Sequence, residues 1–127
     1  MRGSCLCGQV SYQILDKPRS VFGCHCSQCR KTSGHYVAAT QTLNENLEVK
    51  GHENITWYQS SDVAKRGFCK TCGSQLFWAR LISNHTSVMA GTIDGDTGLK
   101  MERQLHPESK GDYYTLPDAQ IVEKTAL

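Results

Sequence analysis

The feature that most limits how this chain can fold is the grouping of its seven cysteines into three short clusters. The clusters are Cys5-Leu6-Cys7, Cys24-His25-Cys26-Ser27-Gln28-Cys29 and Cys69-Lys70-Thr71-Cys72. In a secreted disulfide-rich domain, cysteines usually pair and therefore occur in even number. Here the number is odd, and Met1–Val10 has too few apolar residues for a signal peptide. The cysteines are better interpreted as metal ligands in a reducing compartment, which predicts a cytoplasmic protein.

Cys69 and Cys72, followed by Gly73, form the sequence pattern of a zinc knuckle. The two-residue gap lets both sulfur atoms face one ion, and glycine accepts the positive φ angle that closes such a turn. A knuckle supplies two ligands, whereas tetrahedral zinc needs four. Cys5 and Cys7 can supply the other two, because side chains two residues apart on a strand point to the same side. These four cysteines are therefore predicted to form a structural zinc site.

The remaining cysteines are Cys24, Cys26 and Cys29, and the chain has no eighth cysteine. A second zinc ion at this cluster would have three protein ligands and an open position, which is typical of a catalytic zinc. Two alternatives stay open. His25 or His35 can close the site as a fourth ligand, or a C-x-x-C pair can act as a redox motif, although no βαβ pattern surrounds either pair.

Short segments rich in β-branched and aromatic residues predict a mainly antiparallel β domain over residues 1–127, with little helix. Strands are expected at Gly8–Leu15, Val21–Cys26, Tyr36–Leu43, Leu47–Val49, Ile55–Tyr58, Lys65–Phe68, Leu76–Ile82 and Ser87–Ile93. Ser27–Ser33 is expected to run from a knuckle into one helical turn. The tail from Met101 onward is polar, and no strand is predicted there.

The charge and hydrophobic content of the chain limit the kinds of molecule that it is expected to bind. The formal net charge is only +2, which argues against nucleic acid or an anionic membrane as the main partner. No apolar run approaches the ~20 residues that span a bilayer. Only 39% of the residues are hydrophobic, so metal binding would usefully supplement a modest core.

Three stretches, Gly3–Tyr12, Cys24–Gly34 and Arg66–Leu76, resemble the glutathione-dependent formaldehyde-activating enzymes, which share a domain with centromere protein V. The resemblance implies a β-tent fold, in which a pair of antiparallel sheets is held at one edge by the four-cysteine zinc. It implies the same division of the cysteines into four and three. It also implies a carbon–sulfur lyase that, in reverse, joins glutathione to formaldehyde as S-hydroxymethylglutathione. Fold and zinc sites transfer between relatives better than substrate does.

The three-cysteine cluster has its own chemistry. Three thiolates on Zn²⁺ give a formal charge of −1, so such a zinc is less suited to acidifying water than to holding a further soft thiolate. Arg30 and Lys31 directly follow the last ligand and are predicted to offset this charge or to bind the carboxylates of glutathione. The predicted catalytic residues are therefore Cys24, Cys26, Cys29, Arg30 and Lys31. His25 is either a proton carrier or a structural histidine.

Two functions from different classes follow. The first is a zinc-dependent enzyme acting on a small thiol such as glutathione, or on its adduct. The second is a non-catalytic zinc module that binds protein. A zinc deaminase is excluded, because the H-x-E motif of those enzymes is absent.

Overall fold

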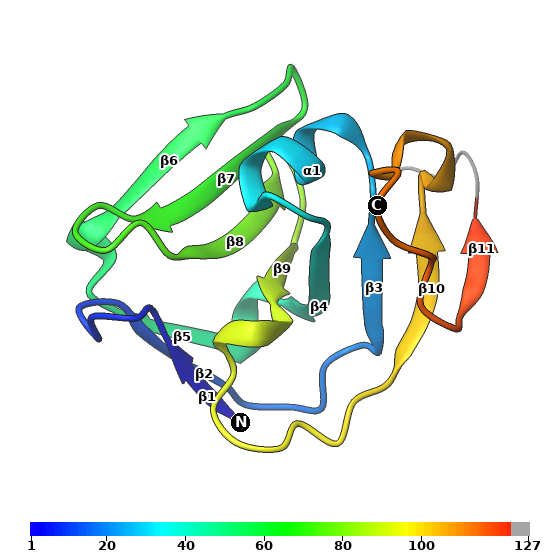
Figure 1. Ribbon diagram of the computed structural model, residues 1–127. Helices are drawn as coiled ribbons and strands as arrows, with labels where there is room; N and C mark the ends of the chain where they lie inside the picture. The colour runs from blue at the N-terminus through cyan, green and yellow to red at the C-terminus, as the bar shows by residue number, and fades with distance from the viewer. Residues whose placement is uncertain (123–127) are drawn as a thin grey trace.

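The computed structural model describes residues 1–122, which form eleven β-strands and one α-helix joined by turns and loops (Figure 1). The strands are β1 (Arg2–Ser4), β2 (Ser11–Ile14), β3 (Val21–Cys24), β4 (Val37–Leu43), β5 (Leu47–Lys50), β6 (Ile55–Gln59), β7 (Ala64–Cys69), β8 (Gln75–Arg80), β9 (His85–Met89), β10 (Met101–Leu105) and β11 (Gln120–Val122). Within these residues the only α-helix is α1 (Ser27–Ser33). The prediction of a mainly β fold with little helix is confirmed. Residues 123–127 of the predicted domain lie outside the described part of the chain.

Short 3₁₀ turns occupy four of the connections: η1 (Asn44–Asn46), η2 (His52–Asn54), η3 (Ala90–Thr92) and η4 (Pro107–Ser109). The turn η3 replaces the end of the strand that was expected to reach Ile93, and α1 is longer than the single turn expected. No helix in residues 1–122 is long and apolar enough to cross a membrane.

The strands form two sheets. The small sheet has the order β1-β2-β5, and the large sheet has the order β11-β10-β3-β4-β9-β8-β7-β6. The chain passes between the sheets three times: from β2 to β3, from β4 to β5 through η1, and from β5 to β6 through η2. Neighbouring strands in the described chain are antiparallel, except that β10 runs parallel to both β3 and β11. The large sheet is therefore mixed rather than purely antiparallel.

The main core lies between the two sheets. On β2, Tyr12 and Ile14 are buried while the alternate residues Ser11 and Gln13 are half-buried, as the two-residue period of a strand requires. The ring of Tyr12 meets Phe77 of β8 edge-on, with 5.7 Å between ring centres. Cys5 and Cys69 belong to the same buried cluster. The four-cysteine group therefore lies where the two sheets meet.

A second, smaller core underlies α1. Its buried members are Cys24, Cys29, Val37, Ala39, Met89 and Leu105. Cys29 is the buried residue of α1, so the helix is attached to the large sheet through one of the predicted metal ligands.

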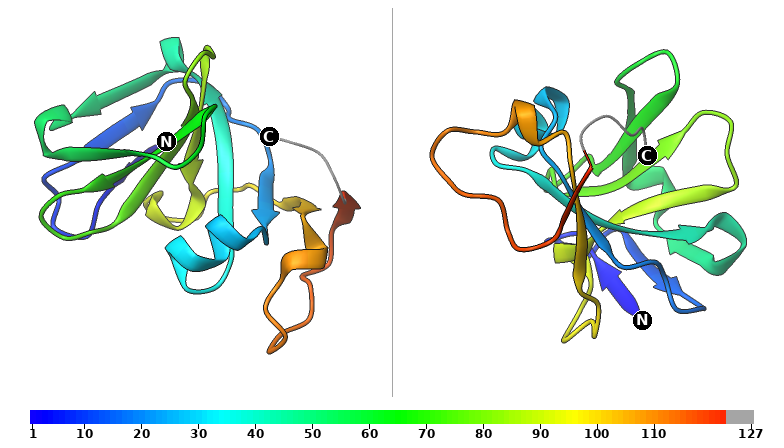
Figure 2. Two further views of the ribbon diagram at one scale, coloured as in Figure 1. Left: turned by 90° about the horizontal axis from the view of Figure 1, so that it is seen from above. Right: turned by 90° about the vertical axis from the view of Figure 1, so that its right-hand side faces the viewer.

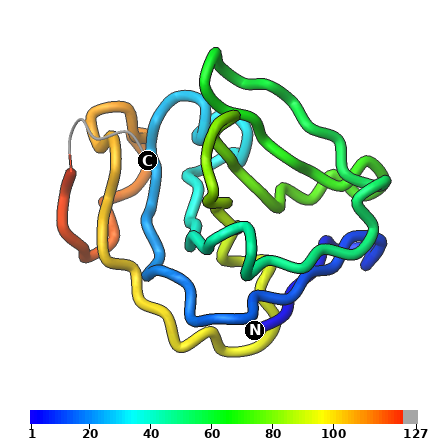
Figure 3. The backbone as a smooth tube through the Cα atoms, turned by 180° about the vertical axis from the view of Figure 1, so that it is seen from behind, coloured from blue at the N-terminus to red at the C-terminus, as the bar shows by residue number. Residues whose placement is uncertain are grey.

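The tail folds back along the strand that leads into the second cysteine cluster. β10 pairs with β3 so that Leu105 lies opposite Cys24. Figure 2 shows β10 and β11 at one end of the large sheet, apart from the small sheet, and Figure 3 shows the tail running alongside β3. The polar composition of this segment predicts no strand, and β10 and β11 correct that expectation. Gln104 is nevertheless fully buried, since its side chain is hydrogen-bonded to His25 and to the carbonyl of Pro117.

Candidate functional site

The sulfur atoms of Cys5, Cys7, Cys69 and Cys72 all lie within 4.8 Å of one another. The Sγ atom of Cys7 is 3.6 Å from that of Cys5 and 3.7 Å from that of Cys69. Tetrahedral zinc with Zn–S bonds of about 2.3 Å requires S···S distances of about 3.8 Å. The group predicted from spacing is therefore assembled with dimensions that fit one tetrahedral ion.

The knuckle formed by Cys69 and Cys72 closes with a glycine turn. Gly73 has a φ angle of 77°, and its N–H donates to the carbonyl of Cys69 at 2.8 Å. The Sγ atom of Cys72 is 3.2 Å from the hydroxyl of Ser74. Hydrogen bonds, first from this hydroxyl and then from the Ser74 backbone, lower the pKa of Cys72 to about 5. Cys72 is thus prepared as a thiolate, the form that binds metal.

The second group comprises Cys24, Cys26 and Cys29, whose sulfur atoms also lie within 4.8 Å of one another. Cys24 ends β3, and Cys26 is the N-cap of α1, where its Sγ accepts the N–H of Cys29 at 3.3 Å. Hydrogen bonds from Cys24 and then Cys29 lower the pKa of Cys26 to about 2, whereas the pKa of Cys24 is raised, first by its hydrogen bond to Cys26. A metal ion bound here would therefore release protons from the other thiols.

Neither histidine near this group joins the sulfurs. In the described chain the three-cysteine group includes no histidine. His25 is fully buried, with Nε2 2.6 Å from Oε1 of Gln104 and Nδ1 2.5 Å from the hydroxyl of Tyr114. Because the Gln104 oxygen can only accept, Nε2–H donates to it and the Tyr114 hydroxyl donates to Nδ1. Burial also lowers the pKa of His25. This geometry supports the structural role for His25 and gives no support to a fourth ligand from it.

His35 is exposed, and its Nδ1 atom is 3.0 Å from the hydroxyl of Tyr113. Its ring also packs against Tyr36 and Tyr114, with ring centres 4.6 and 4.4 Å away. Aromatic contacts with the tail therefore hold this imidazole, and His35 is not part of the sulfur group either.

The three-cysteine group faces a pocket of about 220 Å³. Besides the cysteines, its lining includes Val63 from the β6–β7 loop, Arg66 and Trp78 from β7 and β8, and His106 from the connection after β10. The four-cysteine group is assembled from two cysteine motifs, whereas this pocket takes its walls from four separate segments. A small organic molecule could therefore approach the three sulfurs from the pocket.

Arg66 is a buried cation in contact with one of the three sulfurs. Its Nη2 atom is 3.6 Å from Sγ of Cys29 and 3.4 Å from Oε1 of Gln28. The side chain is only 6% exposed, and its Nε and Nη1 atoms are buried without a hydrogen-bond partner among the described residues. A buried cation needs compensating negative charge. The thiolates of the three-cysteine group would supply it when a metal is bound. The pKa of Cys29 itself is raised: its hydrogen bond to Cys24 lowers it, but the hydrogen bond to Cys26 and burial outweigh that effect and the opposing charge of Arg66.

The predicted cations lie elsewhere on α1. Arg30 is half-buried and Lys31 is exposed, and neither is among the residues that line the pocket in the described chain. Sequence proximity to Cys29 favoured these two residues, whereas Arg66 reaches the sulfurs through the position of β7. Arg66 stands three residues before Cys69, but nothing in the sequence indicates that it faces the other cluster. His106, in the polar tail, was likewise missed.

Comparison with known proteins assigns this chain to a family. The family model of the glutathione-dependent formaldehyde-activating enzyme matches residues 1–115. An uncharacterized lyase of Schizosaccharomyces pombe is 30% identical over 114 residues, which are 88% of this chain and 82% of the yeast protein. The crystal structure of a Rhodobacter sphaeroides protein matches with a TM-score of 0.61 at 30% identity, over 76% of this chain and 90% of that one. The chain therefore belongs to the glutathione-dependent formaldehyde-activating enzyme family.

Proposed function

We propose that this protein is a zinc-dependent carbon–sulfur lyase that forms or cleaves an adduct between a small thiol, such as glutathione, and an aldehyde. The observation that carries the proposal is a group of three cysteine sulfurs facing a pocket, with no fourth protein ligand among the described residues. Family membership and the lyase name of the yeast relative support it. A cytoplasmic location, where such thiols are kept reduced, is part of the same proposal.

The donor atoms fit two zinc ions. Thiolates are soft ligands, and an all-sulfur tetrahedral group is typical of zinc or an iron–sulfur centre. Cys5, Cys7, Cys69 and Cys72 would hold a structural ion. The other three cysteines would hold a second ion, which when bound would stabilise the thiolate form of a substrate thiol.

The chain's own residues adjust the charge of this second site. Three thiolates and Zn²⁺ sum to −1, and the adjacent guanidinium of Arg66 brings the local total to zero. A substrate thiolate would return the total to −1, so Arg66 would lower the electrostatic cost of its entry. Because the cation is buried, this attraction is screened less than one at the surface would be.

Two other features serve the substrate. Val63 and Trp78 give the pocket apolar walls, which would exclude water from the reacting carbon and sulfur. Arg30 and Lys31, outside the pocket lining, keep their predicted role only as longer-range partners for the carboxylates of glutathione.

A crystal structure of the zinc-loaded protein soaked with glutathione tests the proposal. We expect the glutathione sulfur within bonding distance of the zinc held by Cys24, Cys26 and Cys29, with the peptide lying along the pocket. A fourth protein ligand in that position, or a pocket that stays empty at saturating glutathione, would favour the non-catalytic zinc module instead.

A further inference from the structure

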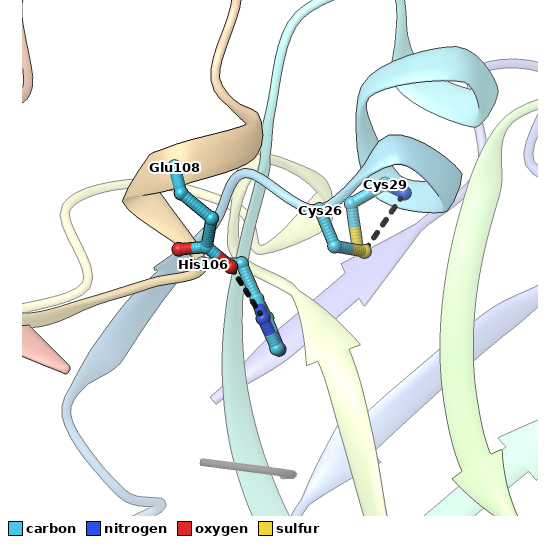
Figure 4. Close-up of polar contacts among 4 residues, drawn as sticks. All are labelled: Cys26, Cys29, His106 and Glu108. Atoms are coloured by element: carbon cyan, nitrogen blue, oxygen red, sulfur yellow. Dashed lines mark hydrogen bonds and ion pairs between the residues drawn. The ribbon is translucent and has the colours of Figure 1, made fainter. Parts of the chain in front are cut away.

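One side chain in the pocket differs from the rest in its chemistry. His106 lines the same pocket as the three cysteines and is 30% exposed there. It comes from the connection between β10 and η4, whereas Cys26 and Cys29 come from the start of α1 (Figure 4). The two segments are about 80 residues apart in the chain and meet because β10 pairs with β3. The tail thus brings an imidazole to a pocket whose other ionisable lining residues are cysteines and arginines.

The backbone at His106 has an unusual conformation. Its φ and ψ angles are 54° and 51°, and it is the only non-glycine residue with positive φ in residues 1–122. Pro107 follows, and a residue before proline normally adopts an extended conformation. The backbone is held on both sides, since the His106 N–H donates to Val122 at 3.3 Å and its carbonyl accepts from Ser109 at 3.2 Å. Strained residues of this kind concentrate at functional sites.

Glu108 lies beside one nitrogen of the His106 ring. Its Oε1 atom is 3.5 Å from Nδ1 of His106 (Figure 4). A carboxylate beside Nδ1 favours the tautomer with the proton on that nitrogen. Nε2 is then left with a free lone pair and can accept a proton.

Elimination among the pocket residues points to the same group. The cysteines are the expected metal ligands, and arginine cannot be deprotonated in proteins. The hydroxyl of Ser61 accepts the backbone N–H groups of Val63 and Ala64 at 3.2 and 3.1 Å. Among the described lining residues, His106 carries the one imidazole, a group whose nitrogens can both accept and donate a proton.

We propose that His106 is the general base and acid of the lyase reaction, a role that rests on the proposed function. In cleavage, Nε2 of His106 accepts the proton of the hydroxyl on the adduct carbon. The O–H electron pair forms the C=O bond, the C–S bond breaks, and its electron pair leaves with sulfur as the thiolate. In the reverse direction, the thiolate attacks the aldehyde carbon and the carbonyl oxygen takes the proton from the imidazolium.

The test uses His106→Asn, because asparagine adopts positive φ more readily than most residues and therefore preserves the backbone. Exchange between glutathione, formaldehyde and their adduct is followed by NMR, and the uncatalysed rate is subtracted. Loss of a general acid–base group typically costs 10²–10⁴-fold, so we expect the catalysed rate to fall by roughly 100-fold or more. In His106→Gly, added imidazole should restore part of the rate. His52→Asn, an exposed histidine on η2, is the matched control and should keep the full rate.

A second measurement separates this role from binding and from metal ligation. The cobalt(II)-substituted His106→Asn protein should show the wild-type spectrum and the wild-type affinity for glutathione. A spectrum already altered before thiol is added would show that His106 is a metal ligand, and would overturn its role as a base. A full catalysed rate in His106→Asn would overturn the role while leaving the proposed function intact. No catalysed exchange in the wild type would overturn both.

Discussion

In the four-cysteine group, the sulfurs come from two segments that lie far apart in the chain, Cys69 being 62 positions after Cys7. The three-cysteine group takes its ligands from Cys24 to Cys29 alone. The first group joins the small sheet to the large one, and Cys5 and Cys69 are part of the core between them. The second lies at the end of β3 and the start of α1, beside a pocket.

The sequence separation of the cysteines predicts that the four-cysteine group contributes more to the stability of the fold and that the three-cysteine group is more open to ligands. A metal that closes a long loop removes much conformational freedom from the unfolded chain, whereas one held by six consecutive residues removes little. The local group is correspondingly free to leave one position to a ligand. Under the proposed function, cysteine would therefore stabilise the fold in one region and bind substrate in the other.

The largest expected effect is on stability. Cys72→Ser should cost far more than Cys29→Ser, because a structural zinc contributes on the order of 10 kcal/mol to the folded state, comparable to the whole net stability of a small domain. Thermal unfolding of the zinc-loaded variants measures the difference. Cys26→Ser adds a matched comparison, since Cys26 and Cys72 are both half-buried and serine is a good N-cap for α1. Equal losses of melting temperature at the two groups would show that the division of roles is wrong.

The next effect concerns Arg66. Arg66→Met keeps much of the bulk of the side chain but removes the cation beside Cys29. The negative charge of an entering substrate thiolate would then no longer be balanced by a nearby positive charge. We expect glutathione to bind about 10–100-fold more weakly, or roughly 1.4–2.8 kcal/mol. Titration of the cobalt-substituted protein gives the dissociation constant. Arg66→Lys, which keeps the charge, should recover part of the affinity, and an unchanged constant in Arg66→Met would remove this residue from the site.

A smaller effect is expected at Arg30 and Lys31. Replacing both with glutamine should weaken glutathione binding by about threefold, because charges near the surface typically contribute no more than about 1 kcal/mol. Zinc content should not change, since neither residue belongs to the sulfur groups. The same titration measures the effect. A loss larger than that of Arg66→Met would show that the sequence-based choice of cation was the better one.

These comparisons also show what the sequence could predict. The division into four and three cysteines follows from local spacing, because a knuckle or a C-x-C segment brings its sulfurs together whatever surrounds it. Most strands followed from residue type, as at β4 and β6, where the expected and observed bounds nearly coincide.

The pocket could not be read from spacing. Arg66 and His106 reach it through strand pairing, β7 with β8 and β10 with β3. The polar residues of β10 gave no strand pattern in the sequence. Gln104 can be buried in this strand because His25 and the carbonyl of Pro117 supply its hydrogen-bond partners. The charge and the base at the site therefore depend on tertiary contacts that no local pattern records.

The central claim is that the three-cysteine group has an open position for a substrate thiol. Adding glutathione to the cobalt(II)-substituted protein tests it most directly, with S-methylglutathione, which has no free thiol, as the control. We expect the thiolate-to-cobalt absorption to rise with added glutathione and to saturate at one glutathione per chain. S-methylglutathione should leave the absorption unchanged. A spectrum that glutathione leaves unchanged would contradict the claim, because it would mean that the second metal is already fully coordinated or closed to thiols.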